Sequence, residues 1–499
     1  MSSRQKTNGS PYTRLYKHAL ESIFAHIGLS DLAHINATCR DWSAAVSSML
    51  SIRAHVHVAA TAAADIKLRA IRDSRLMRHV AEFQSSVCDA SEIAILCDII
   101  KRNHSLTAVK LRNSNVGAAG AAALADAISQ SESLATFDVY DNSIGAVGAA
   151  AIADAITRNK SLTTVDLSSN SIGDQGAIAI ACAIKQSSSL TAVDLGCNSI
   201  GDVGAAAIAE AIAQSSSSSS SSMVTVILCN NPISDVGACA IAEAIINQSK
   251  LSSSLSSLYL SCALFGATGA IALANAIKQS NSLTEVDLSH NNIGDDAVAA
   301  LSEAVRQSES LVILCLECIL LGEKSATEFA KAIGQSKKLT TVKLGGNSIG
   351  REGAIAIAEA VKQSKTLTWV ELGSNSIGDV GASAMAEAIG HSKTLTAVDL
   401  SHNKIDTAGV VALADSIKQS ASMTTVKLNG NKIGAAGVSA IAEALKQSKS
   451  LATVDLSCNA IGAEGAVAIT ESIKQSTSLT WVDLSFNKSA VTIVHRGKS

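Results

Sequence analysis

Residues 161–187 read SLTTVDLSSNSIGDQGAIAIACAIKQS, and nearly the same line returns at residues 366–392 (TLTWVELGSNSIGDVGASAMAEAIGHS) and 394–420 (TLTAVDLSHNKIDTAGVVALADSIKQS). The asparagine of L-x-x-N marks a register with a 28-residue period, in which eleven of fourteen markers are Asn. The markers are Ser114, Asn142, Asn170, Asn198, Asn231, Ala263, Asn291, Ile319, Asn347, Asn375, Asn403, Asn431, Asn459 and Asn487. Two steps are longer, 198 to 231 and 231 to 263, and their insertions (215–222 and 249–254) predict loops. A period of this size indicates one solenoid of stacked repeats.

A single repeat predicts one strand, one turn and one helix. The alternation Val165-Asp166-Leu167 has the two-residue period of a strand, with Asp166 outward. Asn170 at the turn can bond backbone groups that the bend leaves unpaired, and the stacked Asn residues are expected to do this along the whole array, as a ladder. Asp174 can cap a helix. One apolar helical face then follows, with Ala177, Ile180, Ala181 and Ile184.

The stacking distances predict a curved array. Strands stack at about 4.8 Å and helices at about 8–10 Å, so the strands must lie on the inner side. The sequence therefore predicts an α/β solenoid shaped as a horseshoe, with parallel strands on the concave face and helices on the convex face.

The consensus L-x-x-V-D-L-x-x-N-x-I-G, with a full helix in each repeat, resembles the leucine-rich repeats of the ribonuclease-inhibitor type over about residues 77–490. Similar repeats occur in NLR immune receptors, in the Ran GTPase-activating protein and in F-box proteins. The resemblance therefore implies a leucine-rich repeat solenoid that binds partners, and it leaves the particular function open.

The N-terminal residues 15–50 do not follow the register and predict a small all-α module of three amphipathic helices. Their pattern, Ile23-Phe24-x-x-Ile27-x-Leu29-x-Asp31-Leu32 followed by Cys39-Arg40-x-Trp42, resembles the F-box, which docks the adaptor subunit of cullin-type ubiquitin ligases. The resemblance implies adaptor contacts by Leu15, Ile23, Phe24, Ile27, Leu29, Leu32, Cys39 and Trp42. It departs from the family at Leu15-Tyr16, where a Leu-Pro pair is usual. The alternative is a helical cap over the first repeat.

The expected domain plan has five parts. A disordered tail (1–14) precedes the F-box-like module (15–50). Residues 51–104 form a helical linker and N-terminal cap with a degenerate leading repeat at Phe83, residues 105–490 form the repeats, and 491–499 form a tail. The segment after Asn487 is too short for another helix, so either residues 490–494 fold back as a partial cap or another chain covers the last strand.

The outward residue of each strand maps the concave face. The column reads Lys110, Asp138, Asp166, Asp194, Ile227, Tyr259, Asp287, Cys315, Lys343, Glu371, Asp399, Lys427, Asp455 and Asp483. With eight acidic and three basic members its formal charge is −5, against −3 for the whole chain. This concentration favours a basic protein partner. The alternative is that Asp is only the consensus solvent residue of the repeat.

Two further features decorate the column. Trp369 and Trp481 stand one position before the strand valine, where other repeats have mostly Thr or Ala, and exposed tryptophan is typical of binding sites. They lie four repeats apart, about 20 Å at the strand spacing, and cannot share one pocket. Residues 227–321 depart from the consensus, either because they determine binding specificity or because the repeat has decayed under weak selection. The predicted partner-binding residues are Asp138, Asp166, Asp194, Ile227, Tyr259, Asp287, Trp369, Glu371, Asp399, Asp455, Trp481 and Asp483.

Composition excludes several classes of protein. No apolar run reaches the roughly 18–20 residues that span a bilayer, and the polar N-terminus has no signal peptide. A net charge of −3 argues against nucleic-acid binding, and the eleven cysteines indicate free thiols in a cytoplasmic or nuclear protein. We find no phosphate loop, zinc-protease or nucleophile-elbow motif, and Cys315-x-x-Cys318 has no second pair. We expect no catalytic, cofactor or metal site.

Three functional hypotheses remain. The first is the substrate-recognition subunit of a cullin-type (SCF) ubiquitin ligase, in which residues 15–50 dock the adaptor and the horseshoe holds the target. The second is a leucine-rich repeat scaffold or NLR-like sensor without a ligase role. The third is a regulator that resembles the Ran GTPase activator.

Overall fold

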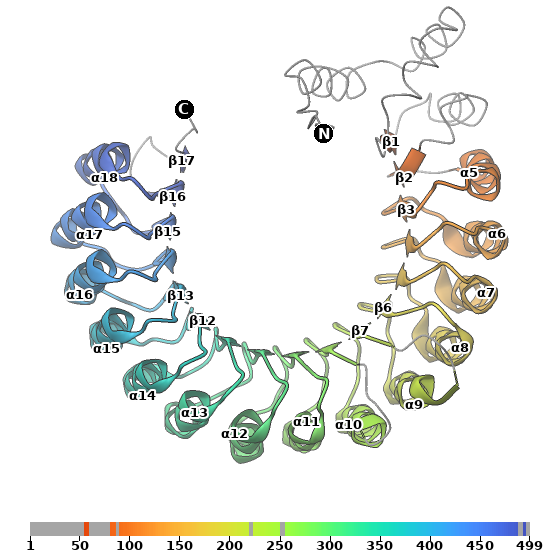
Figure 1. Cartoon of the computed structure of the whole chain (residues 1–499), viewed down its shortest axis with the longest axis horizontal. Coiled ribbons are helices and arrows are strands. Elements are labelled where there is room, and N and C mark those ends of the chain that lie inside the picture. The colour runs from red at the N-terminus through yellow and green to blue at the C-terminus, as the bar shows by residue number, and fades with distance from the viewer. Residues whose placement is uncertain are drawn as a thin grey trace, which may run out of the picture.

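The computed structural model describes residues 54–58, 80–85, 89–218, 223–249, 255–487 and 493–495. Strands line the inner side of a horseshoe and helices form its outer side, as Figure 1 shows. The predicted α/β horseshoe is confirmed. The F-box-like module at residues 15–50 lies outside the described residues.

The described strands form one seventeen-stranded sheet. They are β1 (Ala54–Val58), β2 (Val80–Ser85), β3 (Ala108–Leu111), β4 (Thr136–Asp138), β5 (Thr164–Asp166), β6 (Ala192–Asp194), β7 (Thr225–Ile227), β8 (Ser257–Tyr259), β9 (Glu285–Asp287), β10 (Ile313–Cys315), β11 (Thr341–Lys343), β12 (Trp369–Glu371), β13 (Ala397–Asp399), β14 (Thr425–Lys427), β15 (Thr453–Asp455), β16 (Trp481–Asp483) and β17 (Ile493–His495).

Helices connect consecutive strands from β2 to β16. They are α5 (Ala90–Arg102), α6 (Gly117–Ser129), α7 (Gly145–Arg158), α8 (Gly173–Gln186), α9 (Asp202–Ser218), α10 (Asp235–Ser249), α11 (Ala267–Gln279), the 3₁₀ turn η2 (Asp295–Ala297) with α12 (Val298–Gln307), α13 (Glu323–Gln335), α14 (Gly350–Gln363), α15 (Gly378–His391), α16 (Thr407–Gln419), α17 (Ala435–Gln447) and α18 (Ala463–Gln475). Residues 215–218 of the first insertion therefore continue α9, where a loop was predicted.

Each strand from β1 to β15 pairs in parallel with the next one along the chain. The register keeps equivalent positions side by side, so Asp138 pairs with Asp166 and Asp166 with Asp194. Every column of the repeat is therefore a row of neighbouring side chains across the concave face.

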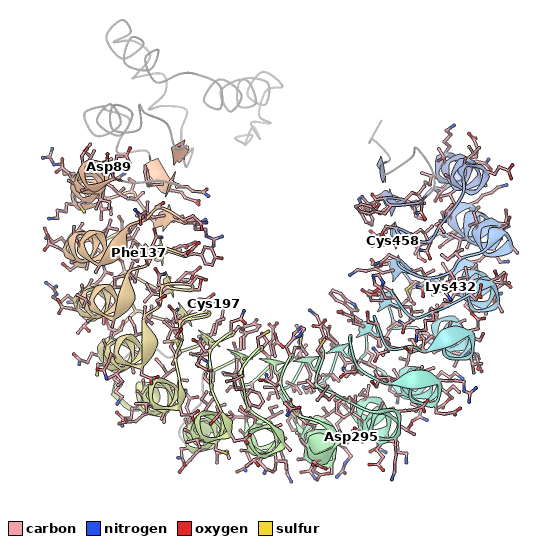
Figure 2. All side chains as sticks on the ribbon, turned by 180° about the vertical axis from the view of Figure 1, so that it is seen from behind. Asp89, Phe137, Cys197, Asp295, Lys432 and Cys458 are labelled. Carbon is pink, nitrogen blue, oxygen red and sulfur yellow. The ribbon has the colours of Figure 1, made fainter. Side chains whose placement is uncertain are left out.

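The core lies between the sheet and the helices. Val165 and Leu167 are fully buried on the side of the sheet that faces the helices, and the predicted apolar face of α8 packs against them. Figure 2 shows side chains filling this layer, where Phe137 is among the largest that are completely buried. Close helix packing needs small residues: a Cβ added to Gly176 would lie 3.1 Å from Ala149 Cβ of the preceding helix. Because the same packing recurs between all neighbouring repeats, the core is continuous along the array and no single repeat has a core of its own.

The asparagine markers form a hydrogen-bonded ladder. Asn170 Oδ1 accepts the backbone N–H groups of Asn142 (3.0 Å) and Ile144 (3.3 Å) in the preceding repeat. Its Nδ2 donates to the carbonyl oxygens of Val139 (2.8 Å) and Leu167 (3.0 Å). The amide satisfies buried backbone groups on both sides of the junction, which is why the turn conserves its shape through the regular repeats.

Aspartates at the helix starts act on the neighbouring repeat. Asp174 lies inside the first turn of α8, and its Oδ1 accepts the N–H groups of Gly201 (2.7 Å) and Gly204 (2.9 Å) at the start of α9. The predicted cap thus serves the following helix. Asp202 does the same for α10 through Ser234 (2.8 Å).

The ladder is interrupted in the middle of the array. Ala263 and Ile319 are buried at marker positions and have no side-chain amide. Asn291 lies between them, and its Oδ1 is buried without a hydrogen-bond partner among the described residues. Every marker asparagine of the flanking repeats accepts at least one backbone N–H group of the preceding repeat, whereas the predicted ladder is interrupted between β7 and β10.

Both ends differ from the predicted plan. Ala54–Val58 form strand β1 inside the predicted helical linker, because the alternation AHVHV has the two-residue period of a strand. Phe83 is buried on β2, which pairs with β3. Ile493–His495, in the predicted tail, form β17 and pair antiparallel with β16. This is the fold-back that was one of the two expectations for the C-terminal end.

Candidate functional site

The concave face presents three columns of side chains. They are the first strand residue, the third strand residue, and the residue two positions beyond the strand. The structure places the predicted acidic column at the third position of strands β4–β16. Trp369 and Trp481 occupy the first position of β12 and β16, and both are half-buried.

The aspartates of the column have a structural hydrogen bond. Asp166 Oδ1 accepts the backbone N–H of Ser168 (3.0 Å), and Asp194 Oδ1 accepts that of Gly196 (2.8 Å). The same bond to the residue two positions later recurs at Asp138, Asp287, Asp399, Asp455 and Asp483. This bond stabilises the end of each strand, and it explains why the repeat retains Asp.

The second carboxylate oxygen is used differently. Arg112 Nε lies 2.6 Å from Asp138 Oδ2, and Arg112 also lies 3.8 Å from Asp166 Oδ2. Lys427 Nζ lies 3.1 Å from Asp399 Oδ2. In Asp138, Asp166 and Asp399, Oδ1 therefore binds the backbone while Oδ2 pairs with a basic group.

Arg112 and its neighbours were not predicted from the sequence. The guanidinium lies 6.0 Å from the centre of the Tyr140 ring, and it bridges β4 and β5 through Asp138 and Asp166. Arg112 and Tyr140 belong to the column beyond the strand, where most repeats have Ser or Gly. That contrast was the signal that could have identified them.

Asp194 is the next acidic residue along the face. Burial raises its pKa to about 6, with repulsion from Asp166 and Asp138 in the same direction and the bond from Gly196 opposing it. Asp194, Asp287, Asp455 and Asp483 have no salt bridge within 4.0 Å among the described residues.

Trp369 lies between two lysines. The Nζ atoms of Lys343 and Lys427 lie 5.6 Å and 6.0 Å from its ring centre. Such cation–π contacts fix the indole on the concave surface. Both lysines belong to the third-position column, but they were not predicted as site residues.

Glu371, next to Trp369, belongs to a carboxyl pair. A Cβ added to Gly345 would lie 3.3 Å from Glu371 Oε1 and 3.5 Å from Glu317 Oε1, so both carboxyl groups lie over this glycine. Burial raises the pKa of Glu371 to about 7, together with a hydrogen bond and repulsion from Glu317, while Lys343 acts in the opposite direction. Glu317 was missed because it also lies beyond the strand.

The middle of the face is less polar. Ile227 and Tyr259 lie side by side on β7 and β8. Burial, followed by a hydrogen bond to Glu285, raises the pKa of Tyr259 to about 12. Burial also raises the pKa of Cys315 to about 12, so this thiol is protonated at neutral pH.

The predicted site is distributed along the face and has no single centre. Trp369 and Trp481 are separated by strands β13–β15. Within the described ranges, no three His, Cys, Asp or Glu side chains are grouped so that they could hold a metal ion. No helix in the part of the chain that the structure describes is long and apolar enough to cross a membrane. The predicted adaptor contacts, from Leu15 to Trp42, lie outside that part.

Comparison with known proteins agrees with this architecture. Nine segments match the family model described as Leucine Rich repeat, at residues 102–125, 158–181, 186–209, 279–302, 335–358, 363–386, 391–414, 419–442 and 447–469. These nine segments are leucine-rich repeats, and the fold of the described residues is a leucine-rich repeat solenoid. No curated protein sequence matches the chain.

Solved structures with similarity to the chain include an internalin (inlF) from Listeria monocytogenes, with 16% identity, 79% of this chain and 94% of that chain covered, and a TM-score of 0.44. The TLR13–ssRNA13 complex has 15% identity, 84% and 64% coverage, and a TM-score of 0.47. The actin-binding site 2 of leiomodin-1 has 20% identity, 30% and 86% coverage, and a TM-score of 0.27. They carry no conclusion about the function of this chain.

Proposed function

We propose that the protein is a non-catalytic interaction protein whose concave face binds a basic segment of a protein partner. One observation carries the proposal: Arg112 and Lys427 of the molecule itself already bind Oδ2 atoms of this column. Other aspartates, such as Asp194 and Asp287, present an equivalent carboxylate in the same register. A partner's lysine or arginine would occupy the place that Arg112 has at Asp138.

The structural role of Asp gives a sharp test. Asparagine keeps the side-chain oxygen that accepts the backbone N–H, but it removes the charge. If Asp is only a structural residue, Asp→Asn should leave partner binding unchanged. If the charge binds the partner, the same substitution should weaken binding and reduce its dependence on salt.

The experiment compares Asp194→Asn/Asp287→Asn with Asp154→Asn, a matched change on the convex helix α7. Cross-linking and mass spectrometry of the full chain identify a partner, whose purified form is then titrated against each variant. We expect about tenfold or greater loss for the concave pair and no loss for the convex control. Equal affinity of all three proteins would contradict the proposal.

A finer proposal concerns the ligase. The F-box-like pattern of residues 15–50 supports a substrate-recognition subunit of a cullin-type ubiquitin ligase, with this module on the adaptor and the repeats at 105–490 on the target. The repeat consensus supports the ribonuclease-inhibitor type. The adaptor should co-purify with the intact chain and be lost when residues 1–50 are deleted.

Equal recovery of the adaptor with both forms, or recovery with neither, would leave the scaffold or sensor as the better hypothesis. An assay of GTP hydrolysis with and without the protein tests the GTPase-activator hypothesis, for which an unchanged rate is the negative result.

A further inference from the structure

The repeats between β7 and β10 carry apolar residues at surface positions. At the equivalent positions, most other repeats have Asp, Thr, Ala, Ser or Lys. Leu264 and Leu320 expose 69% and 64% of their surface, at a turn position where most other repeats have Ser, Asn or Lys. We name as the apolar strip Ile227, Tyr259 and Ile313 on strands β7, β8 and β10, together with Pro232, Leu264 and Leu320 in the turns that follow these strands.

Decay of the repeat does not account for the strip. Random loss of the consensus would also damage the core, yet Val226, Leu258 and Leu314 are fully buried at their usual positions. Even the changed markers Ala263 and Ile319 remain buried. The substitutions change the surface and preserve the packing, and clustered exposed apolar residues are typical of interaction sites.

Leu320 adds a second argument from the backbone. Its φ is +63°, a left-handed conformation that is unfavourable for leucine. The equivalent turn residues with positive φ are small or polar: Asn115, Ser143, Ser171, Ser199, Ser376, Lys404 and Ala460. The chain therefore keeps an exposed leucine where backbone conformation and solvation both oppose it, as happens at functional positions.

Acidic groups interrupt and border the strip. On β9, Asp287 lies in register between Tyr259 of β8 and Cys315 of β10. Asp194 lies beside Ile227 at the other edge. From β6 to β10 the third strand position is therefore acidic on β6 and β9 and apolar on β7, β8 and β10. Neighbouring strands are spaced about 4.8 Å apart.

We infer that the apolar strip docks an extended segment of a protein partner in which apolar side chains are separated by a lysine or arginine. The apolar side chains lie against β7, β8 and β10 and against the turns that follow them, and the basic side chain lies against Asp287 on β9. This inference rests on the proposed function, and it assigns to one part of the concave face the partner chemistry that the face as a whole leaves open.

A library of random peptides displayed on phage, selected against the full chain, tests the inference. Each selected peptide is then synthesised and titrated against the parent, against Leu264→Ser/Leu320→Ser and against Val147→Gln. Serine is the most frequent residue of the repeats at this turn position. Val147 is 73% exposed outside the strip, and Gln175 is its equivalent in the next repeat. Circular dichroism confirms that each variant is folded.

The expected peptides combine aliphatic or aromatic residues with an intervening Lys or Arg. They should bind the double variant about tenfold or more weakly and bind Val147→Gln like the parent. Equal affinity for the double variant overturns the inference. If the same peptides are weakened by Asp194→Asn/Asp287→Asn alone, the proposed function survives without the strip.

Three other outcomes also count against the inference. Peptides that depend on the two leucines but contain Asp or Glu would contradict the charge assignment. A dimer of the parent chain that the double substitution dissociates would assign the strip to a second copy of the chain. A selection without any binding peptide would count against both the strip and the concave face as a peptide-binding surface.

Discussion

The repeats at β3–β6 and those at β7–β10 have the same core and different surfaces. In the first group the asparagine ladder is complete, and Asp138, Asp166 and Asp194 line the face. In the second group Ala263 and Ile319 interrupt the ladder, and most of the column is apolar. The difference shows that the buried apolar residues maintain the register even where the ladder is interrupted, so the surface of a repeat can change without loss of the fold.

The largest expected effect comes from breaking the ladder where it is complete. Asn170→Ala removes the bonds from Asn142 and Ile144 and leaves buried backbone groups unpaired. We expect a loss of about 2–4 kcal/mol in the free energy of unfolding. Urea unfolding followed by circular dichroism measures it, and a loss below about 0.5 kcal/mol would show that water replaces the amide.

A smaller loss should follow from Arg112→Gln. Asp138 has only 4% of its side chain exposed, so removing Arg112 leaves a buried carboxylate without its charged partner. We expect about 1–3 kcal/mol of destabilisation at neutral pH. The control is Asp138→Asn in the same background, which should recover much of the loss. If the double variant is no more stable than Arg112→Gln, the ion pair is not the cause.

Asp194→Asn should instead stabilise the protein. The pKa of Asp194 is raised from 3.8 to about 6, so the folded protein binds this proton more tightly than the unfolded chain does. The cost of ionisation therefore develops as the pH rises from about 4 to 6 and is complete above that window. Allowing for the partial exposure of Asp194, we expect the free energy of unfolding of Asp194→Asn to exceed that of the parent by about 1–2 kcal/mol above pH 7.

The pH dependence of the gain is the check. Thermal unfolding of Asp194→Asn and the parent should differ above about pH 7 and converge near pH 4. A gain that is the same at both pH values would mean that the carboxylate charge is not responsible.

The smallest effect is expected where the ladder is already absent. Ala263→Asn restores the marker, but the preceding turn has a different bond, from Ile233 N–H to the carbonyl oxygen of Asn231 (2.7 Å). Because the N–H of Ile233 already donates to this carbonyl oxygen, the new amide cannot accept from it, and we expect the free energy of unfolding to change by no more than about 0.5 kcal/mol. A gain comparable to the loss in Asn170→Ala would show that the two groups of repeats have the same turn.

The sequence predicted what depends on periodicity. The horseshoe, the concave strands and the ladder all follow from the 28-residue register, because each repeat packs only on its neighbours. Contacts between long side chains of different repeats were not predicted. Arg112 reaches Asp138 and Asp166, and Glu317 meets Glu371 across Gly345, through rotamers that no period specifies.

Strands β1 and β17 were also outside the prediction of a linker and a tail. Each is a short alternating or β-branched segment without a repeat around it, AHVHV and IVH, and its place depends on pairing with the end of the sheet. Such segments have a strand pattern too short to identify before their partner strand is known.

The interrupted ladder has a mechanical consequence. In a curved array of identical repeats, every junction between neighbours has the same stiffness, so a bending deformation is shared evenly among the junctions. The junctions at Ala263 and Ile319 lack the amide that ties neighbouring turns, so we expect bending to concentrate there. The most flexible junctions would then coincide with the apolar strip, so a change in the width of the horseshoe would alter the geometry of that surface first.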